Sequence, residues 1–285
     1  MRVSADEIGR ISGMLLQMIA LFPSRTVALA LGPLDIHWYG ILYLLGFLIG
    51  MRLLPRLIEY RGVSLTEKQR ESLLLHVFLG VLLGGRLGYV LFYGLAFYAQ
   101  HPAQIFAVWQ GGMSSHGGFV GVALMLLRFA RRNRISLLSL TDILVVPVAI
   151  GLSLGRLGNL INGELYGTLT TVPWGMHFPG VEGLRHPTQV YAMFKDVLIA
   201  LICFVHLRRS SAQQAGADAV SVSTTALFLM MYAILRFTIE SLRDQPFGYS
   251  MILGFSLSRG QLLTIPLFVL GMGIWLWRSS LRERS

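Results

Sequence analysis

The sequence has few charged residues and a single cysteine. Only 13% of its 285 residues are Asp, Glu, Lys or Arg, whereas 54% are hydrophobic, and its mean hydropathy is +0.62. An average soluble domain carries about twice this share of charged residues, so the composition excludes an ordinary soluble protein. The lone Cys203 excludes a disulfide framework and a thiolate metal cluster. The composition indicates a protein of the lipid bilayer.

Common metal and nucleotide motifs are also absent. The sequence contains no H-E-x-x-H pair, no P-loop and no paired metal-binding carboxylates. We therefore expect no metal and no cofactor. A serine nucleophile at Ser115 beside His116 is not expected either, because adjacent positions of a helix point about 100° apart.

Apolar segments recur along the chain and predict membrane-spanning helices, since roughly 20 apolar residues cross the hydrocarbon core. Arginines and lysines concentrate in alternate connections, which is the positive-inside pattern. We expect an all-α integral membrane protein of about seven transmembrane helices, with the N-terminus outside and the C-terminus cytoplasmic. The net charge of +10 then reflects topology, and no nucleic-acid partner is expected. The predicted spans are Trp38–Leu57, Leu73–Tyr93, Met113–Ala130, Ile143–Ile161, Pro187–Leu207, Val222–Leu242 and Gln261–Trp277.

The predicted spans form one membrane domain, residues 37–285, preceded by an N-terminal arm of residues 1–36. The apolar stretch Ile11–Phe22 in this arm is short and is not followed by a signal-peptide cleavage pattern. We expect it to lie in the membrane interface. Outward connecting segments are expected near residues 94–115, 163–186 and 243–260, and Ser210–Asp218 is a polar linker.

Arginines lie within the predicted spans, close to their outward ends. At 1.5 Å per residue, Arg86, Arg156 and Arg236 fall within about 10 Å of those ends. An arginine in the bilayer is costly unless it is ion-paired or has a function, and Glu240, four residues after Arg236, can neutralise only part of the charge. Each arginine therefore either packs helices as part of an ion pair or binds an anion. Guanidinium groups suit phosphate oxygens, so the head group of an anionic lipid is the expected ligand.

Three further polar residues are expected at the same depth. Tyr39 begins the first span, Asn159 lies near the outward end of the fourth, and His116 precedes the apolar core of the third. An imidazole can accept a proton near neutral pH, so His116 is a candidate general base. The alternative is a polar residue that only forms hydrogen bonds at a helix start.

Residues 155–167, GRLGNLINGELYG, resemble the signature of bacterial prolipoprotein diacylglyceryl transferases. The resemblance covers the chain except for the arm before Pro33 and the linker after Arg209. Further matching motifs are HWYG at 37–40, GGRLGY at 84–89, HGG at 116–118, RHPTQ at 185–189, Arg236 to Glu240, and Gly260-Gln261.

The resemblance implies a seven-helix enzyme of the bacterial cytoplasmic (inner) membrane. Its partners would be phosphatidylglycerol, a prolipoprotein signal peptide with a lipobox cysteine, and membrane lipid. The reaction would transfer a diacylglyceryl group to the cysteine thiol and release glycerol phosphate. The catalytic positions implied are Tyr39, His116, Arg156, Asn159, Arg236 and Glu240, and the substrate-binding positions are Arg86, Gly117, Gly118, Glu164, Gly167 and Gln261.

The sequence departs from the family pattern at Gln110, Ser115 and Leu160, and its outward segment between Trp174 and Arg185 is short. These departures concern substrate preference, because no expected chemical group is lost. Two other readings stay open. Buried arginines and Gly-interrupted helices also occur in transporters or flippases of anionic lipids. An inactive relative would bind signal peptides without catalysis.

Overall fold

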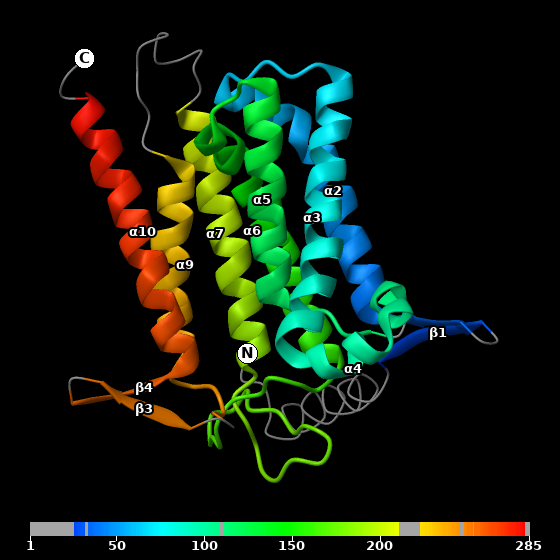
Figure 1. The fold of residues 1–285 in the computed structure, drawn as a ribbon. Helices are drawn as coiled ribbons and strands as arrows, with labels where there is room; N and C mark the ends of the chain where they lie inside the picture. The colour runs from blue at the N-terminus through cyan, green and yellow to red at the C-terminus, as the bar shows by residue number, and fades with distance from the viewer. Residues whose placement is uncertain are drawn as a thin grey trace, which may run out of the picture. The chain divides into compact units, whose positions relative to one another are not determined.

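The computed structural model describes residues 26–31, 34–108, 111–210, 223–245, 248–252 and 254–282. Within these ranges, seven helices contain 17 residues or more (Figure 1). Each contains most of one predicted span, and several extend beyond its apolar core into polar residues. The helices are α2 (Trp38–Arg61), α3 (Glu67–Tyr93), α5 (Ser115–Asn133), α6 (Leu137–Ile161), α7 (Thr188–Arg209), α9 (Thr224–Glu240) and α10 (Arg259–Arg282).

Five of these helices, α2, α3, α6, α7 and α10, are long and apolar enough to cross a membrane. The remaining two are shorter, with 19 residues in α5 and 17 in α9, and their spanning stays a prediction. Large apolar side chains such as Phe92 and Phe194 are 78% and 71% exposed. Exposure of this kind is expected where helices face lipid, because lipid tails are as apolar as the side chains.

The described chain divides into two compact units. One consists of residues 58–143, and the other of the residues up to 57 together with those from 144 onward. The first unit contains α3 and α5, joined by α4 (Leu95–Gln100) and the 3-10 helix η1 (Pro102–Phe106). The second contains α7, α9 and α10, two short hairpins, and most of α2 and α6.

Glycines form the contact between α3 and α5 in the first unit. Gly80, Gly84 and Gly88 recur every fourth residue on α3 and face Gly117 and Gly121 on α5. A Cβ on Gly84 or Gly121 would overlap the backbone of the opposite helix. We call these five residues the glycine seam. Because glycine has no side chain, the two helices pack backbone against backbone.

Side chains at both ends of this helix pair fix its position. At one end, the Gln69 side chain caps the start of α3 in a reciprocal capping box with Thr66. The same side chain donates from Nε2 to Asn133 Oδ1 of α5 at 3.0 Å. At the other end, the Ser114 amide donates to the Gly85 carbonyl at 2.8 Å, and Ser114 Oγ caps α5 by accepting from the Gly117 amide.

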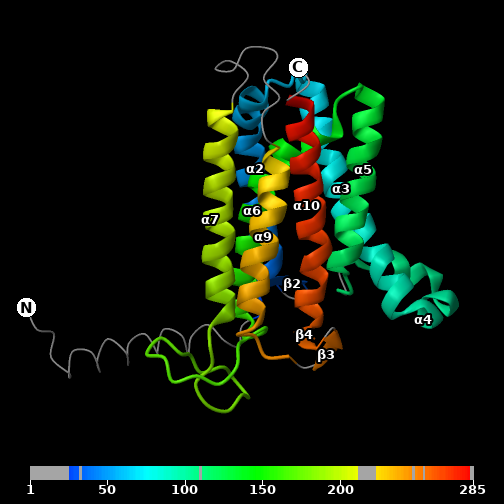
Figure 2. The same ribbon diagram turned by 90° about the vertical axis from the view of Figure 1, so that its left-hand side faces the viewer.

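Two antiparallel hairpins in the second unit each lead into a helix. The strands β1 (Val27–Leu31) and β2 (Leu34–His37) precede α2 (Figure 1), and β3 (Tyr249–Ile252) and β4 (Phe255–Ser258) precede α10 (Figure 2). The sequence analysis predicted neither hairpin. The first one contains described residues of the predicted arm, whereas Ile11–Phe22, Gln110 and most of the predicted linker lie outside the described residues.

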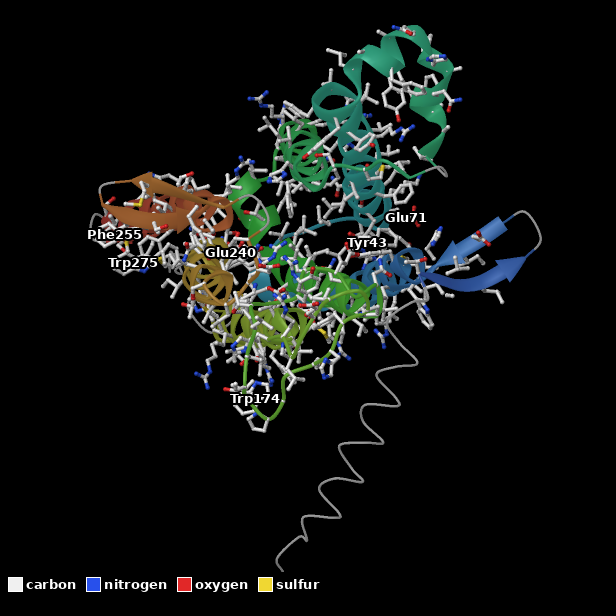
Figure 3. The ribbon with its side chains drawn as sticks, turned by 90° about the horizontal axis from the view of Figure 1, so that it is seen from below. Tyr43, Glu71, Trp174, Glu240, Phe255 and Trp275 are labelled. Atoms are coloured by element: carbon white, nitrogen blue, oxygen red, sulfur yellow. The ribbon has the colours of Figure 1, made fainter. Side chains whose placement is uncertain are left out.

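Several helix ends meet at one end of the second unit. The first turn of α2 contacts the last turn of α6 through Tyr39 and Gly158, and the end of α9 contacts the start of α10 through Glu240 and Gly260. The loop after α6 carries Trp174 at its tip (Figure 3), and the Trp174 indole donates to Tyr191 Oη of α7 at 2.7 Å. This end therefore gathers side chains from five helices and one loop.

Candidate active site

One group of polar side chains joins α2, α6 and the loop that follows α6. The Tyr39 hydroxyl donates to Glu164 Oε1 at 3.1 Å and accepts a short hydrogen bond from the Asn159 side-chain amide. Arg156 Nη1 donates to Asn159 Oδ1 at 3.3 Å. Asn162 also donates to Glu164 Oε1, at 2.9 Å. The chain Arg156–Asn159–Tyr39–Glu164 therefore holds each side chain in a defined orientation, and we call it the tyrosine network.

A second group surrounds the carboxylate of Glu240 at the end of α9. Arg236 Nη2 lies 2.6 Å from Glu240 Oε2, and Arg243 Nη1 lies 3.6 Å from Oε1. The Gln245 side chain donates to Oε1 at 3.1 Å. The ion pair between Arg236 and Glu240, which the four-residue spacing predicts, is confirmed. Glu240 is 2% exposed, so its carboxylate is largely shielded from solvent, and its charged partners are the two arginines.

A small recess lies between these two groups. Three arginines, Arg156, Arg236 and Arg243, line it, and the last two are paired with Glu240. Figure 3 looks onto this end and shows Glu240 beside the end of α9. The remaining lining residues are Leu165, Thr188, Gln189, Ala192 and Ile239.

The recess carries a surplus of positive charge. Three guanidinium groups line it, whereas two carboxylates lie nearby: Glu240, paired with Arg236 and Arg243, and Glu164, which accepts hydrogen bonds from the neutral side chains of Tyr39 and Asn162. The first two residues of α7, Thr188 and Gln189, also line it, so the positive end of that helix dipole adds to the field. This arrangement suits a phosphate group. No group of three or more His, Cys, Asp or Glu side chains in the described ranges is placed to hold a metal ion.

Two of the predicted substrate-binding residues in this unit have structural contacts of their own. Gly167 packs so closely against His186 and the Leu242 carbonyl that a Cβ would overlap both. Gln261 forms a reciprocal capping pair with Ser258 at the start of α10: the Ser258 amide donates to Gln261 Oε1, and the Gln261 amide donates to Ser258 Oγ. Their substrate-binding roles stay predictions.

Arg86 belongs to the unit of residues 58–143, and backbone carbonyls surround its guanidinium. Nε donates to the Ile105 oxygen at 2.8 Å, Nη2 to the Gln104 oxygen at 2.6 Å, and Nη1 to the oxygens of Gly111 and Gly112 at 2.6 and 3.1 Å. The side chain is 4% exposed. These contacts favour a structural role for Arg86, in which it fixes the segment before α5, over a role in binding substrate. The sequence suggested an ion pair as the structural alternative, whereas the partners in the structure are backbone carbonyls.

His116 lies in the first turn of α5 in the same unit and is exposed. The two glycines that follow it are buried, and Gly117 is part of the glycine seam. Close helix packing thus accounts for Gly117, whereas Gly118 meets only the Val81 carbonyl at an ordinary contact distance. The role of His116 as a base, its approach to the arginines and the substrate contacts of both glycines stay predictions.

The sequence analysis missed three residues of the recess. Arg243 follows α9 and lies three residues after Glu240, a spacing that could have indicated the contact. Thr188 and Gln189 belong to the RHPTQ motif at the start of α7 but were given no role. Their position follows from the loop after α6, since Thr188 Oγ1 donates to the Leu165 oxygen and Gln189 Nε2 to the Glu164 oxygen, both at 2.7 Å.

The apolar helices and the recess lined by three arginines are typical of a multi-pass membrane protein with charged residues gathered at one end of its helices. Comparison with known proteins narrows this class. The model of the prolipoprotein diacylglyceryl transferase family matches residues 26–277, and the chain belongs to this family.

Individual relatives are similar in sequence to this chain over nearly the same length. A phosphatidylglycerol–prolipoprotein diacylglyceryl transferase of Bordetella parapertussis is 43% identical over 256 residues, which cover 88% of this chain and 94% of the relative. The protein of that name from Geobacter sulfurreducens is 42% identical over 243 residues, covering 85% and 90%. That from Nitrosomonas europaea is 41% identical over 253 residues, covering 88% of each chain.

Proposed function

We propose that the protein transfers the diacylglyceryl group of phosphatidylglycerol to the thiol of the lipobox cysteine in prolipoproteins. The reaction forms a thioether, releases glycerol phosphate and is the first step of bacterial lipoprotein maturation. Membership of the family supports this reaction. The observation that carries the assignment of the site is the recess lined by Arg156, Arg236 and Arg243, the last two of which are paired with Glu240.

The arginines suit the leaving group of this reaction. When sulfur attacks the glyceryl carbon, the bond from that carbon to the phosphate oxygen breaks and its electron pair stays on the phosphate. Negative charge therefore grows on the leaving group, and fixed guanidinium groups stabilise it without reorganising. Glu240 orients Arg236 and Arg243 through ion pairs, and Asn159 orients Arg156. Tyr39 holds Asn159 in turn and offers a hydroxyl to the head group or the peptide.

The attacking thiol must first lose its proton. A free cysteine has a pKa of about 8.5, and the thiolate is the nucleophile, so a nearby base raises the reactive fraction. We assign this role to His116. Replacement by Gln removes the base and preserves a polar side chain, and we expect at least about a hundredfold loss of kcat. Full activity of His116→Gln would rule out this assignment.

We also propose that all seven long helices cross the bacterial inner membrane, with an outward N-terminus and a site open to the outer leaflet. The arm of residues 1–36 would lie in the interface, before the membrane domain of residues 37–285. The clustering of Arg and Lys in alternate connections supports this topology. Single cysteines can test it, since Ser256 and Ser64 are both exposed. A membrane-impermeant maleimide should label Ser256→Cys in intact cells and leave Ser64→Cys unlabelled; the reverse would invert the topology.

The decisive experiment combines purified protein, phosphatidylglycerol vesicles and a lipobox peptide. Released glycerol phosphate and the mass of the peptide are measured. We expect a thioether-linked diacylglyceryl peptide from the native protein and almost none from Arg156→Ala. The matched control is Arg208→Ala, an exposed arginine in the last turn of α7, which should keep its activity.

Other outcomes separate the remaining readings. A folded protein that binds the peptide but gives no product would be an inactive relative. Lipid movement between leaflets without a modified peptide would indicate a flippase. Native activity in Arg156→Ala would show that the leaving group is stabilised elsewhere.

A further inference from the structure

Gln189 has a buried oxygen without a hydrogen-bond partner at the wall of the arginine recess. The residue is 1% exposed and is the second residue of α7. Gln189 lines the recess together with Arg156 and Arg236. Among the described residues, no donor reaches Oε1 of Gln189. Buried polar atoms are normally satisfied, so an orphaned acceptor at a binding site indicates a missing donor.

The orientation of the Gln189 amide is fixed. Nε2 donates to the backbone oxygen of Glu164 at 2.7 Å. Rotating the amide by half a turn would place Oε1 against that carbonyl, and two acceptors would then face each other. Oε1 is therefore the atom that remains for a ligand. The side chain of Glu164 also accepts a hydrogen bond from the Tyr39 hydroxyl. The tyrosine network therefore helps to hold the residue to which the Gln189 amide is bonded.

The chemistry around Oε1 restricts its donor. An amide oxygen accepts from a hydroxyl or from a nitrogen that carries hydrogen. The arginines that line the recess repel an ammonium group, whereas a neutral hydroxyl meets no such penalty. The hydroxyl of Thr188, the preceding residue in the chain, is already used, since it donates to the Leu165 oxygen. An uncharged donor therefore suits this site, and a hydroxyl of a ligand whose phosphate the arginines hold is such a donor.

We propose that Gln189 Oε1 accepts a hydroxyl of the glycerol head group, and that this bond selects glycerol phosphate as the leaving group. The inference rests on the proposed function and extends it from the phosphate to the rest of the head group. Arg156, Arg236 and Arg243 bind the charge, which many phospholipids share. Gln189 distinguishes the polyol. An anionic lipid without head-group hydroxyls leaves the buried acceptor unpaired, which lowers its reactivity about tenfold to a hundredfold.

The test compares two lipids of equal charge, phosphatidylglycerol and phosphatidylpropanol, as donors to a lipobox peptide. For the native protein we expect kcat/KM to favour phosphatidylglycerol by about tenfold or more. In Gln189→Met, which removes the acceptor and keeps a side chain of similar length, this ratio should fall to near one. A ratio that stays at the native value, with both rates lowered equally, would overturn the inference and leave Gln189 a structural residue.

Thr188→Val provides the matched control, since Thr188 also lines the recess but has a hydroxyl that is already bonded. This variant should keep the native preference between the two lipids, whatever its absolute rate. Loss of the preference in both variants would mean that general disturbance of the recess, and not Oε1, changes selectivity.

Lipid binding separates failure of this inference from failure of the proposed reaction. Native mass spectrometry of the detergent-solubilised protein, with each lipid added in turn, requires no catalysis. Suppose that the native protein shows no transfer but binds phosphatidylglycerol more tightly than phosphatidylpropanol, and that Gln189→Met binds both lipids equally. This result would support the hydroxyl site and contradict the proposed reaction. Equal binding of both lipids by the native protein would refute the hydroxyl site.

Discussion

The carboxylate of Glu240 at the end of α9 lies directly against the Cα of Gly260 in the first turn of α10, so that a Cβ at position 260 would overlap it. The same carboxylate holds Arg236 and Arg243 in the recess. Gly260 therefore limits where this carboxylate can lie, and through the carboxylate it affects the position of both guanidinium groups.

Replacement of Gly260 by Ala should impair the reaction. The added methyl group displaces the Glu240 carboxylate, and a shift of about 1 Å at an active site costs roughly a hundredfold in rate. We expect a loss of this order in kcat/KM, measured by release of glycerol phosphate. Gly273→Ala is the control on the same helix, since nothing lies within 4 Å of a Cβ there. Equal activities of the two variants would contradict the role of Gly260.

A similar comparison is available on α6. A Cβ on Gly158 would overlap the ring of Tyr39 and disturb its bonds to Asn159 and Glu164. We expect Gly158→Ala to lower kcat about tenfold or more because the tyrosine network loses its alignment. Gly151→Ala lies on the same helix with open space around its Cβ position and should retain native kinetics. The prediction fails if Gly158→Ala is as active as this control.

The glycine seam predicts a loss of stability that depends on position. In Gly84→Ala the new Cβ meets the backbone of α5, and overpacking of this kind costs about 1–3 kcal/mol. The midpoint of thermal unfolding in detergent should fall by several degrees. Gly118→Ala is the control, since its nearest neighbour, the Val81 oxygen, lies at 3.7 Å. A larger drop in the control than in Gly84→Ala would show that the seam is not tightly packed.

A buried ion pair on α7 predicts a rescue. Lys195 pairs with Asp196, both are at most 5% exposed, and the ammonium lies 3.9 Å from the centre of the Tyr232 ring. Removing one partner leaves an unpaired buried charge, which costs about 3–5 kcal/mol, whereas replacing both by apolar residues is often neutral.

We therefore expect Lys195→Met to lower the midpoint of thermal unfolding strongly, and the double replacement with Asp196→Leu to restore most of it. Unfolding followed by fluorescence in one detergent measures both variants. If the double variant unfolds at a lower temperature than Lys195→Met, the Asp196 side chain stabilises the fold through contacts other than its pairing with Lys195.

The helices were predictable because the bilayer imposes one length on every apolar segment. The run from Trp38 to Leu57, for example, lies within α2. The short hairpins were not predictable in this way. In β3 and β4, apolar side chains such as Tyr249, Met251 and Phe255 alternate with polar ones over only four residues per strand, which is too short for a periodic signal.

Local spacing predicted part of the candidate site. Arg236 and Glu240 share a helix face, so their ion pair followed from sequence separation alone. The four carbonyls around Arg86 come from an irregular segment whose conformation no local pattern specifies. Lys195 and Asp196 escaped notice because the apolar residues around them dominate the mean hydropathy of their helix. Charged residues within a membrane span are rare and almost always have a partner, so each one is informative even where the mean hydropathy of the span is high.

The glycine seam also bears on how this protein can move. Where two backbones touch, neither helix can slide along the other or roll against it without a collision, because packed contacts of this kind do not deform continuously. Helices α3 and α5 should therefore move as one stiff body. A rearrangement that admits a lipid or releases a modified peptide would bend the chain at the short connections, residues 62–66 and 134–136, and leave the interior of the pair unchanged.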